Sequence, residues 1–250
     1  MILGLLLGNS SLRYAAFDGK SIVERGRIEW QDLDRQAGEI HRFLEGRRIE
    51  EAVIGSVRDD LLGRAVERVP AGIPTLVARR DFPLPIENRY ARPEEAGTDR
   101  LLNAIAARAR SKGAPAIVVD FGTAISISVT SRDGAFLGGL IAAGGRTAAR
   151  GLARSAPRLP AVDPAPLDGS FIRGDTVSAV QAGVYHQVAG GVRQMLRGIT
   201  EDLGGGPALI LATGGEAAVF APGIPEIAGV VPDLGLEGLF QAHASWRAGR

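Results

Sequence analysis

Two stretches of the sequence share one pattern and decide the expected fold: residues 5–11, LLLGNSS, and residues 118–124, VVDFGTA. Each begins with an apolar run, which indicates a buried strand, and continues into a glycine and hydroxyl side chains before a second apolar run. An Asp-Gly turn follows in both copies, at residues 18–19 and 133–134, and is typical of a hairpin. The repeat predicts two copies of one unit, each with a strand, a tight loop and a partner strand.

The two copies differ at one chemically important position. When Gly8 is aligned with Gly122, Asp120 of the second copy corresponds to Leu6 of the first. A loop of this kind at a strand end presents backbone N–H groups and a hydroxyl, which suit a phosphate group. An acid at the end of the strand can hold a cation beside it. The two loops together therefore predict a clamp that binds a polyphosphate, and one side of this clamp lacks its acid. Each copy taken singly could instead be a plain hairpin with a glycine at its bend.

Composition excludes several classes of function. The 250 residues carry a net charge of +1, so nothing favours nucleic acid or an acidic membrane as a partner. There is no cysteine, which excludes disulfides, thiolate metal sites and cysteine nucleophiles. The three histidines, His41, His186 and His243, are far apart and are expected to be surface or capping residues. Residues 1–7 lack the flanks of a signal peptide, so we expect a cytoplasmic protein.

The pattern of apolar residues predicts the same order of elements twice. In the first half we expect strands over 2–7, 12–17, 21–30, 51–57 and 75–78, helices over 33–45, 59–68 and 98–112, and an irregular loop over 81–93. In the second half we expect strands over 116–119, 124–130, 135–141 and 208–212, a helix over 147–155, and one long or broken helix over 176–203. A duplicated α/β fold with subdomains 1–112 and 113–250 follows.

Four blocks of the chain occur in a recognisable order and spacing: residues 8–10, 97–100, 120–124 and 174–176. Together they resemble the type III pantothenate kinases, a family of the acetate kinase–sugar kinase–actin superfold. The first loop, residues 8–10, is similar to the family's Asp-x-Gly-Asn-Thr, and residues 97–100, GTDR, are similar to its Gly-Ala/Thr-Asp-Arg. Residues 120–124, DFGTA, and 174–176, GDT, resemble two further motifs, and residues 213–215, TGG, resemble the adenosine motif. The resemblance implies two ribonuclease H-like (actin-like ATPase) subdomains, each a mixed sheet flanked by helices.

The resemblance also implies a reaction and an acceptor site. It implies ATP-dependent phosphorylation of pantothenate to 4′-phosphopantothenate, the first step of coenzyme A biosynthesis. Asp99 would be the catalytic base, with the substrate bound by Tyr90, Gly97, Thr98, Arg100 and Thr176. Each has a plainer alternative: a helix cap for Asp99 and Thr176, a surface charge for Arg100, and packing for Tyr90.

The nucleotide and its cations are implied in the same way. ATP would be bound, with Mg²⁺, by Leu6, Leu7, Gly8, Asn9, Ser10, Ser11, Leu12, Arg13, Thr123, Gly214 and Gly215. Asp120 would bind a monovalent cation, K⁺ or NH₄⁺. The family's pantothenate site is completed at a dimer interface, which implies a homodimer.

Leu6 departs from the family pattern, because leucine cannot ligate a metal ion and repels its hydration shell. Loss of one preorganised charged contact lowers a rate by on the order of 10²–10³-fold. Two hypotheses remain: a pantothenate kinase weakened at this position, or a catalytically inactive relative with a ligand-binding or regulatory role.

Overall fold

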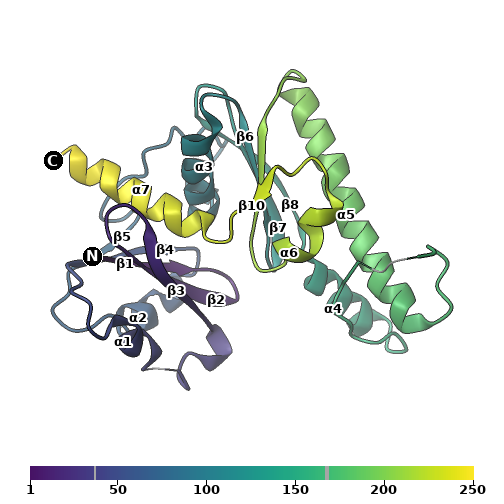
Figure 1. Ribbon diagram of the computed structural model, residues 1–250, viewed down its shortest axis with the longest axis horizontal. Helices are drawn as coiled ribbons and strands as arrows, with labels where there is room; N and C mark the ends of the chain where they lie inside the picture. Colours follow the sequence, from purple (N-terminus) through teal and green to yellow (C-terminus); the bar gives the residue numbers. More distant parts are fainter. Residues whose placement is uncertain (37, 167–168) are drawn as a thin grey trace. The chain divides into compact units, whose positions relative to one another are not determined.

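The computed structural model describes residues 1–36, 38–166 and 169–250, and its chain divides into two compact units (Figure 1). The first unit comprises residues 1–106 and 234–250, and the second comprises residues 107–233. Each unit is built on one five-stranded mixed sheet.

The sheet of the first unit has the strand order β3-β2-β1-β4-β5. Its strands are β1 (Ile2–Leu7), β2 (Ser11–Phe17), β3 (Ile22–Glu29), β4 (Glu51–Ser56) and β5 (Thr75–Val77). The helices are α1 (Glu39–Leu44), α2 (Asp59–Val66), α3 (Thr98–Ser111), whose last turns belong to the second unit, and α7 (Leu234–Ala248), with 3₁₀ turns at Trp30–Asp32 and Pro93–Glu95.

The sheet of the second unit has the equivalent order, β8-β7-β6-β9-β10. Its strands are β6 (Ala116–Phe121), β7 (Ala124–Thr130), β8 (Phe136–Ala143), β9 (Leu209–Thr213) and β10 (Gly229–Val230). The helices are α4 (Gly145–Ser155), α5 (Thr176–Asp202) and the short α6 (Ala217–Phe220), with a 3₁₀ turn at Ala221–Gly223. In both sheets the first strand pairs antiparallel with the second and parallel with the fourth. The predicted duplication is therefore confirmed.

The apolar run of β1 is continuous because both faces of the strand are covered. Leu3, Leu5 and Leu7 contribute to a core cluster that includes residues of α1 and α2. Leu6, on the opposite face, belongs to a second cluster built with α3 and α7. A strand that is buried on both faces has no alternation of polar and apolar residues.

The division into units differs from the expected one at two places. The sequence places the boundary after residue 112, whereas residues 107–112 group with the second unit. Residues 234–250 return to the first unit, because α7 packs on β1 and β4. The sequence did not predict α7.

Two helices also differ in extent from the expectation. The helix expected over 33–45 is formed only as α1, since residues 33–36 form turns and Gly38 precedes the first helical residue. Ala37, within that expected helix, lies outside the described residues. The segment 176–203 forms one unbroken helix, α5, and not a broken pair.

Candidate functional site

The first loop, between β1 and β2, is held by two side chains from outside it. The Gly8 amide closes the bend by donating to the Ser11 carbonyl at 3.0 Å. The Trp30 indole N–H donates to the Gly8 carbonyl at 2.8 Å, and Arg58 donates to the Asn9 carbonyl at 3.2 Å. Asn9 and Ser10 are exposed, so their polar groups can reach a ligand. Sequence reasoning missed Trp30 and Arg58, since only the fold brings them to this loop.

The apolar residues around this loop are core residues. Leu7 and Leu12 are fully buried and Ser11 is nearly so, so they shape the loop but expose no side chain to a ligand. Leu6 is also buried, with 1% of its surface exposed, and a methyl group at Gly55 would lie 3.0 Å from its Cδ1 atom. Arg13 lies directly opposite Leu6 in the β1–β2 register and is partly buried.

The start of α3 brings together the residues predicted to bind the acceptor. Asp99 lies in the first turn, where the helix dipole favours an ionised carboxylate. The Arg100 amide donates to Asp99 Oδ1 at 2.8 Å. A methyl group at Gly97 would lie 2.6 Å from the same oxygen, so the carboxylate folds over a position that only glycine can occupy without displacement. Thr98 is buried at this turn.

Arg100 and Tyr90 are neighbours although ten residues separate them. The Arg100 guanidinium carbon lies 5.7 Å from the centroid of the Tyr90 ring, within the range of a cation–π contact. Arg100 is 95% buried, which is unusual for a surface charge and argues against that alternative. The sequence-predicted residues 90 and 97–100 therefore form one cluster within the first unit.

Two side chains that sequence reasoning missed hold the loop before α3 in place. Arg79 donates to the Ala96 carbonyl at 2.6 Å and to the Pro93 carbonyl at 3.3 Å. Asn88 donates to the Pro93 carbonyl at 3.0 Å and accepts a hydrogen bond from the Tyr90 amide at the same distance. Loop residues before Gly97 are thus fixed by partly buried and exposed hydrogen bonds, as positioning of a substrate requires.

The second loop, in the second unit, lies against the Gly-rich turn after β9. Gly214 has φ +94°, and a methyl group there would lie 2.4 Å from Asp120 Oδ1. Asp120 is paired in register with Thr213 of β9, so its carboxylate faces this turn. Thr123 and Gly215 are exposed. Two neighbouring loops at one edge of this sheet therefore contain four of the residues predicted from the sequence: Asp120, Thr123, Gly214 and Gly215.

Glu216, which sequence reasoning did not single out, ties this region to α4. Its carboxylate accepts hydrogen bonds from the amides of Gly145 at 2.9 Å and Arg146 at 3.0 Å, and its own amide donates to the Phe121 carbonyl at 2.9 Å. It is 94% buried. A carboxylate at a helix N-terminus satisfies amides that have no partner within the helix.

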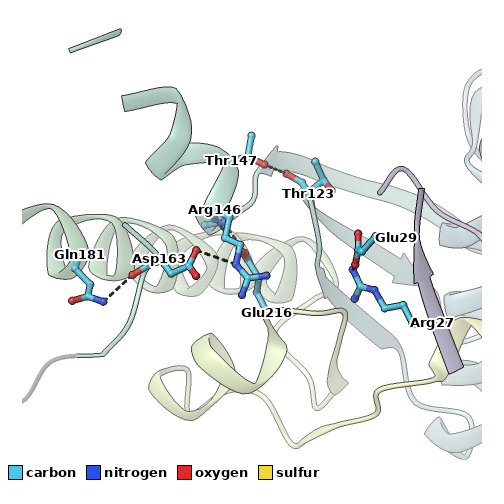
Figure 2. A network of polar contacts seen from close by, with 9 residues as sticks. Arg27, Glu29, Thr123, Arg146, Thr147, Asp163, Gln181 and Glu216 are labelled. Carbon is cyan, nitrogen blue, oxygen red and sulfur yellow. Dashed lines mark hydrogen bonds and ion pairs between the residues drawn. The ribbon is translucent and has the colours of Figure 1, made fainter. Parts of the chain in front are cut away.

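Figure 2 shows the polar network around that helix start. The Arg146 side chain lies 3.2 Å from Asp163 and 3.8 Å from Glu216, and Gln181 of α5 donates to the Asp163 carbonyl at 2.9 Å. Thr147 donates from its hydroxyl to the Thr123 carbonyl at 2.6 Å. The second loop is therefore fastened to α4 through Thr123.

Thr176 lies at the start of α5. The helix is capped by Asp175, whose carboxylate accepts from the Ser178 amide at 2.9 Å, so Thr176 is the first helical residue and not the cap. Hydrogen bonds from the Ser178 hydroxyl and amide lower the pKa of Asp175. Thr176 lines a cavity of about 670 Å³ between α4 and α5.

The expectation that all histidines are surface or capping residues is wrong for His243. This residue of α7 is 98% buried, with its ring edge-on to Phe82 and its Nε2 atom 2.5 Å from Glu51 of β4. Burial lowers the pKa of His243, against the opposing effect of Glu51. The ring completes the packing of α7 on the first unit.

The described residues contain no group of three or more His, Cys, Asp or Glu side chains that could hold a metal ion. Asp120 is a single carboxylate beside a glycine turn, which suits a weakly held cation with other ligands from backbone or a bound ligand.

A family model for type III pantothenate kinases matches residues 2–198. The chain belongs to the type III pantothenate kinase family. A family member from Paramagnetospirillum magneticum is 34% identical, over 97% of this chain and 96% of the relative. A second, from Caulobacter vibrioides, is 31% identical, over 97% of each. The family expected from the four blocks is confirmed.

Solved structures resemble the chain in fold. A Campylobacter jejuni protein assigned to the Baf family of transcriptional activators has a TM-score of 0.63 and 18% identity over 97% of this chain and 98% of its own. A ROK hexokinase from Thermus thermophilus has a TM-score of 0.53 and 16% identity, over 99% of each. MreB 5 of Spiroplasma citri, solved with AMPPNP bound, has a TM-score of 0.51 and 9% identity, over 99% of this chain and 97% of its own. The expected actin-like fold is therefore confirmed.

Membership of a kinase family implies ATP and a divalent metal as cofactors and a small molecule as the acceptor. Among the described residues, no helix has the length and apolar character needed to cross a membrane.

Proposed function

We propose that this family member transfers the γ-phosphoryl group of ATP to the primary hydroxyl of pantothenate, giving 4′-phosphopantothenate. One observation carries the proposal: Tyr90, Gly97, Asp99 and Arg100, the residues that match the family's acceptor motif, form one cluster at the start of α3. In this role the chain acts in the cytoplasm at the first step of coenzyme A biosynthesis.

Asp99 is the proposed catalytic base. It accepts the proton of the acceptor hydroxyl as that oxygen bonds to the γ-phosphorus, while the bridging P–O bond breaks and its electron pair leaves with ADP. Phosphoryl transfer proceeds through a loose transition state, so positioning contributes most of the catalysis. The Arg100 amide and the lack of a side chain at Gly97 hold the Asp99 carboxylate in one place.

Arg100 is the proposed partner of the pantothenate carboxylate. A guanidinium binds a carboxylate through two parallel hydrogen bonds, which fix orientation as well as position. The Tyr90 ring orients this guanidinium from one side. Thr98 supports the same turn from the core.

Both phosphate loops are proposed to serve ATP. The loops in question contain Gly8, Asn9 and Ser10 in the first unit and Thr123, Gly214 and Gly215 in the second. Asn9, Ser10 and Thr123 are exposed and carry polar groups at strand ends that suit phosphate oxygens. A divalent ion supplies charge neutralisation of the phosphates when it is bound. Asp120, facing the Gly214 turn, is the proposed ligand of a monovalent cation.

A homodimer is proposed from exposed apolar side chains of the second unit. Phe171, Ile172 and Val177 are 80%, 89% and 50% exposed, and Ile141 of the edge strand β8 is 65% exposed. Apolar side chains in such number on one unit favour a protein partner. Together with the cavity that Thr176 lines, they support a second copy of the chain as that partner.

The reaction is tested by coupling ADP release to a spectrophotometric readout, with ATP, pantothenate, Mg²⁺ and K⁺. Turnover that depends on pantothenate is expected, and Asp99→Asn is expected to lower kcat by about 10²–10⁴-fold, as for loss of a general base. Asp59→Asn is the matched control, because Asp59 lies in the first turn of α2 and is exposed. An unchanged kcat in Asp99→Asn contradicts the assignment of the base.

Leu6 favours a second candidate function, that of an inactive relative which binds a ligand and acts as a regulator. Its side chain is closed within apolar packing and offers no ligand atom. This candidate predicts no pantothenate-dependent turnover at high enzyme concentration, and turnover in Leu6→Asp if the missing acid is the cause. Thermal unfolding of Leu6→Asp must be measured beside it, since a carboxylate there enters an apolar cluster.

A further inference from the structure

The position of Leu6, at the end of β1, does not fit a metal ion. A magnesium ion requires oxygen ligands and retains several of its waters. Leu6 has no such atom, and methyl groups at Gly55 and Gly235 would lie only 3.0 Å and 2.8 Å from its two terminal carbons. The space beside Leu6 is therefore filled by the protein, and hydrated metal has no place at this residue.

The residue opposite Leu6 carries a positive charge. Arg13 is the direct register partner of Leu6 across β1 and β2, so both side chains lie on the same face of the sheet. A methyl group at Gly235, in the first turn of α7, would lie 3.8 Å from Arg13 Nη2 and 2.8 Å from Leu6 Cδ2. Arg13 thus extends past Leu6 toward the start of that helix.

Arg13 has no anionic partner among the described residues. No side-chain hydrogen bond or ion pair of those residues includes the Arg13 guanidinium, although this side chain is partly buried. Arg27 is the register partner of Arg13 on β3. The charge of Arg27 is paired, because the Arg27 guanidinium lies 2.7 Å from the Glu29 carboxylate (Figure 2). Partial burial of a guanidinium without an acceptor costs desolvation free energy, and an anionic ligand offsets that cost by accepting its hydrogen bonds.

We propose that Arg13 binds a phosphate group of the nucleotide directly and replaces, in the first loop, the contact that an acid makes through a metal ion. This inference rests on the proposed function for the identity of the ligand. A guanidinium suits the fork of phosphate oxygens, and the exposed Asn9 and Ser10 of the adjacent loop carry polar groups that suit the same ligand. Nucleotide binding by this chain therefore depends less on a divalent ion than the family pattern implies.

The test is the affinity of the full chain for ATP, measured by calorimetry with Mg²⁺ and with EDTA. The wild type is expected to bind ATP in EDTA within about fivefold of its affinity in Mg²⁺. Arg13→Gln is expected to lose at least about tenfold in EDTA, the size of a charge-assisted hydrogen bond. Arg27→Gln is the matched control and is expected to retain its affinity, because Arg27 is already paired with Glu29.

A second variant tests the charge at position 6. Leu6→Asp places a carboxylate opposite Arg13, which pairs with it, so the affinity for ATP in EDTA is expected to fall below that of the wild type. The thermal unfolding of both variants confirms that they are folded.

The proposal is overturned if the wild type binds ATP only in the presence of Mg²⁺, or if folded Arg13→Gln keeps its affinity in EDTA. Failure of the proposed function would give a different experimental result. In that case ATP binds as described here, but no turnover appears with pantothenate as the acceptor.

Discussion

The carboxylate of Glu216 caps helix α4 by accepting a hydrogen bond from the Gly145 amide at 2.9 Å. The two residues are 71 positions apart, and the contact joins the Gly-rich turn after β9 to the helix that follows β8. Because the Glu216 amide also bonds to the Phe121 carbonyl, one residue aligns both loops proposed to bind ATP in the second unit.

Replacement of Glu216 is expected to affect the nucleotide more than the acceptor. Glu216→Ala leaves two helix amides without a partner and is expected to lower the free energy of unfolding by about 1–3 kcal/mol. Steady-state kinetics are expected to show a larger rise in KM for ATP than in KM for pantothenate. Glu226→Ala, which removes only the surface pair with Arg193, is the control and is expected to cost less than about 1 kcal/mol. Equal rises in both KM values contradict a local role for Glu216.

A methyl group at Gly97 is expected to damage catalysis without unfolding the protein. In Gly97→Ala the new carbon would lie 2.6 Å from Asp99 Oδ1, so the carboxylate must move. A displacement of about 1 Å lowers kcat by on the order of 10²-fold. Gly63→Ala on α2 is the matched control, because no atom lies within 4 Å of the added carbon. That variant is expected to keep its kcat, and wild-type kcat in Gly97→Ala disproves the proposed geometry.

The pairing of Arg100 with Tyr90 is expected to set affinity for the acceptor. Arg100→Lys keeps the charge but loses the bidentate fork, so KM for pantothenate is expected to rise about tenfold while KM for ATP stays within twofold. Tyr90→Leu removes the ring that orients the guanidinium and is expected to have a smaller effect in the same direction. Arg92→Lys, at an exposed pair with Glu95, serves as the control. A rise confined to KM for ATP shows that Arg100 contacts the nucleotide instead.

His243 is expected to make the fold sensitive to acid. Burial lowers the pKa of the imidazole in the folded state below its ordinary value of 6.5, so the unfolded chain takes up a proton first as the pH falls. Stability is therefore complete above about pH 6.5 and falls below it, by about 1.4 kcal/mol for each unit of the pKa difference. The groups that face the ring are Glu51 and Arg247, with Phe82 and Trp246 beside it.

Chemical denaturation between pH 7.5 and pH 5 measures this effect. His243→Gln is expected to flatten the dependence of the unfolding free energy on pH, whereas His41→Gln, at an exposed position of α1, is expected to leave it unchanged. A steeper acid dependence in His243→Gln means that the imidazole is stabilised in its charged form by Glu51.

Local sequence signals were sufficient for most elements of the fold. The apolar run of β1, the Asp-Gly turns and the helix beginning at Thr98 each lie within a few consecutive residues, and all were predicted. The family blocks also led to the acceptor cluster, because Gly97, Asp99 and Arg100 are adjacent in the chain. Their roles remain predictions.

The rest depends on contacts between distant residues. Nothing in the local sequence distinguishes Glu216 from other polar turn residues, because its partner Gly145 lies 71 positions away. The contact of Arg247 with Glu51 spans 196 positions. Leu6 signals a missing acid in the sequence, but only the packing of α7 and α3 shows that its space is filled. The position of Arg13 between Leu6 and Arg27 likewise follows from the register of three strands and from no local pattern.

The return of α7 to the first unit has a consequence for biosynthesis. Residues 107–233 form a complete unit while the first unit still lacks the helix that covers Leu6 and its neighbours. During translation the second unit can fold before the first is finished, since domains fold as their residues emerge. Until residues 234–248 leave the ribosome, the apolar side chains that α7 covers on the first sheet, Leu6 among them, lack that cover. We therefore expect aggregation of the nascent chain to be favoured at this stage, because transiently exposed apolar surface promotes it.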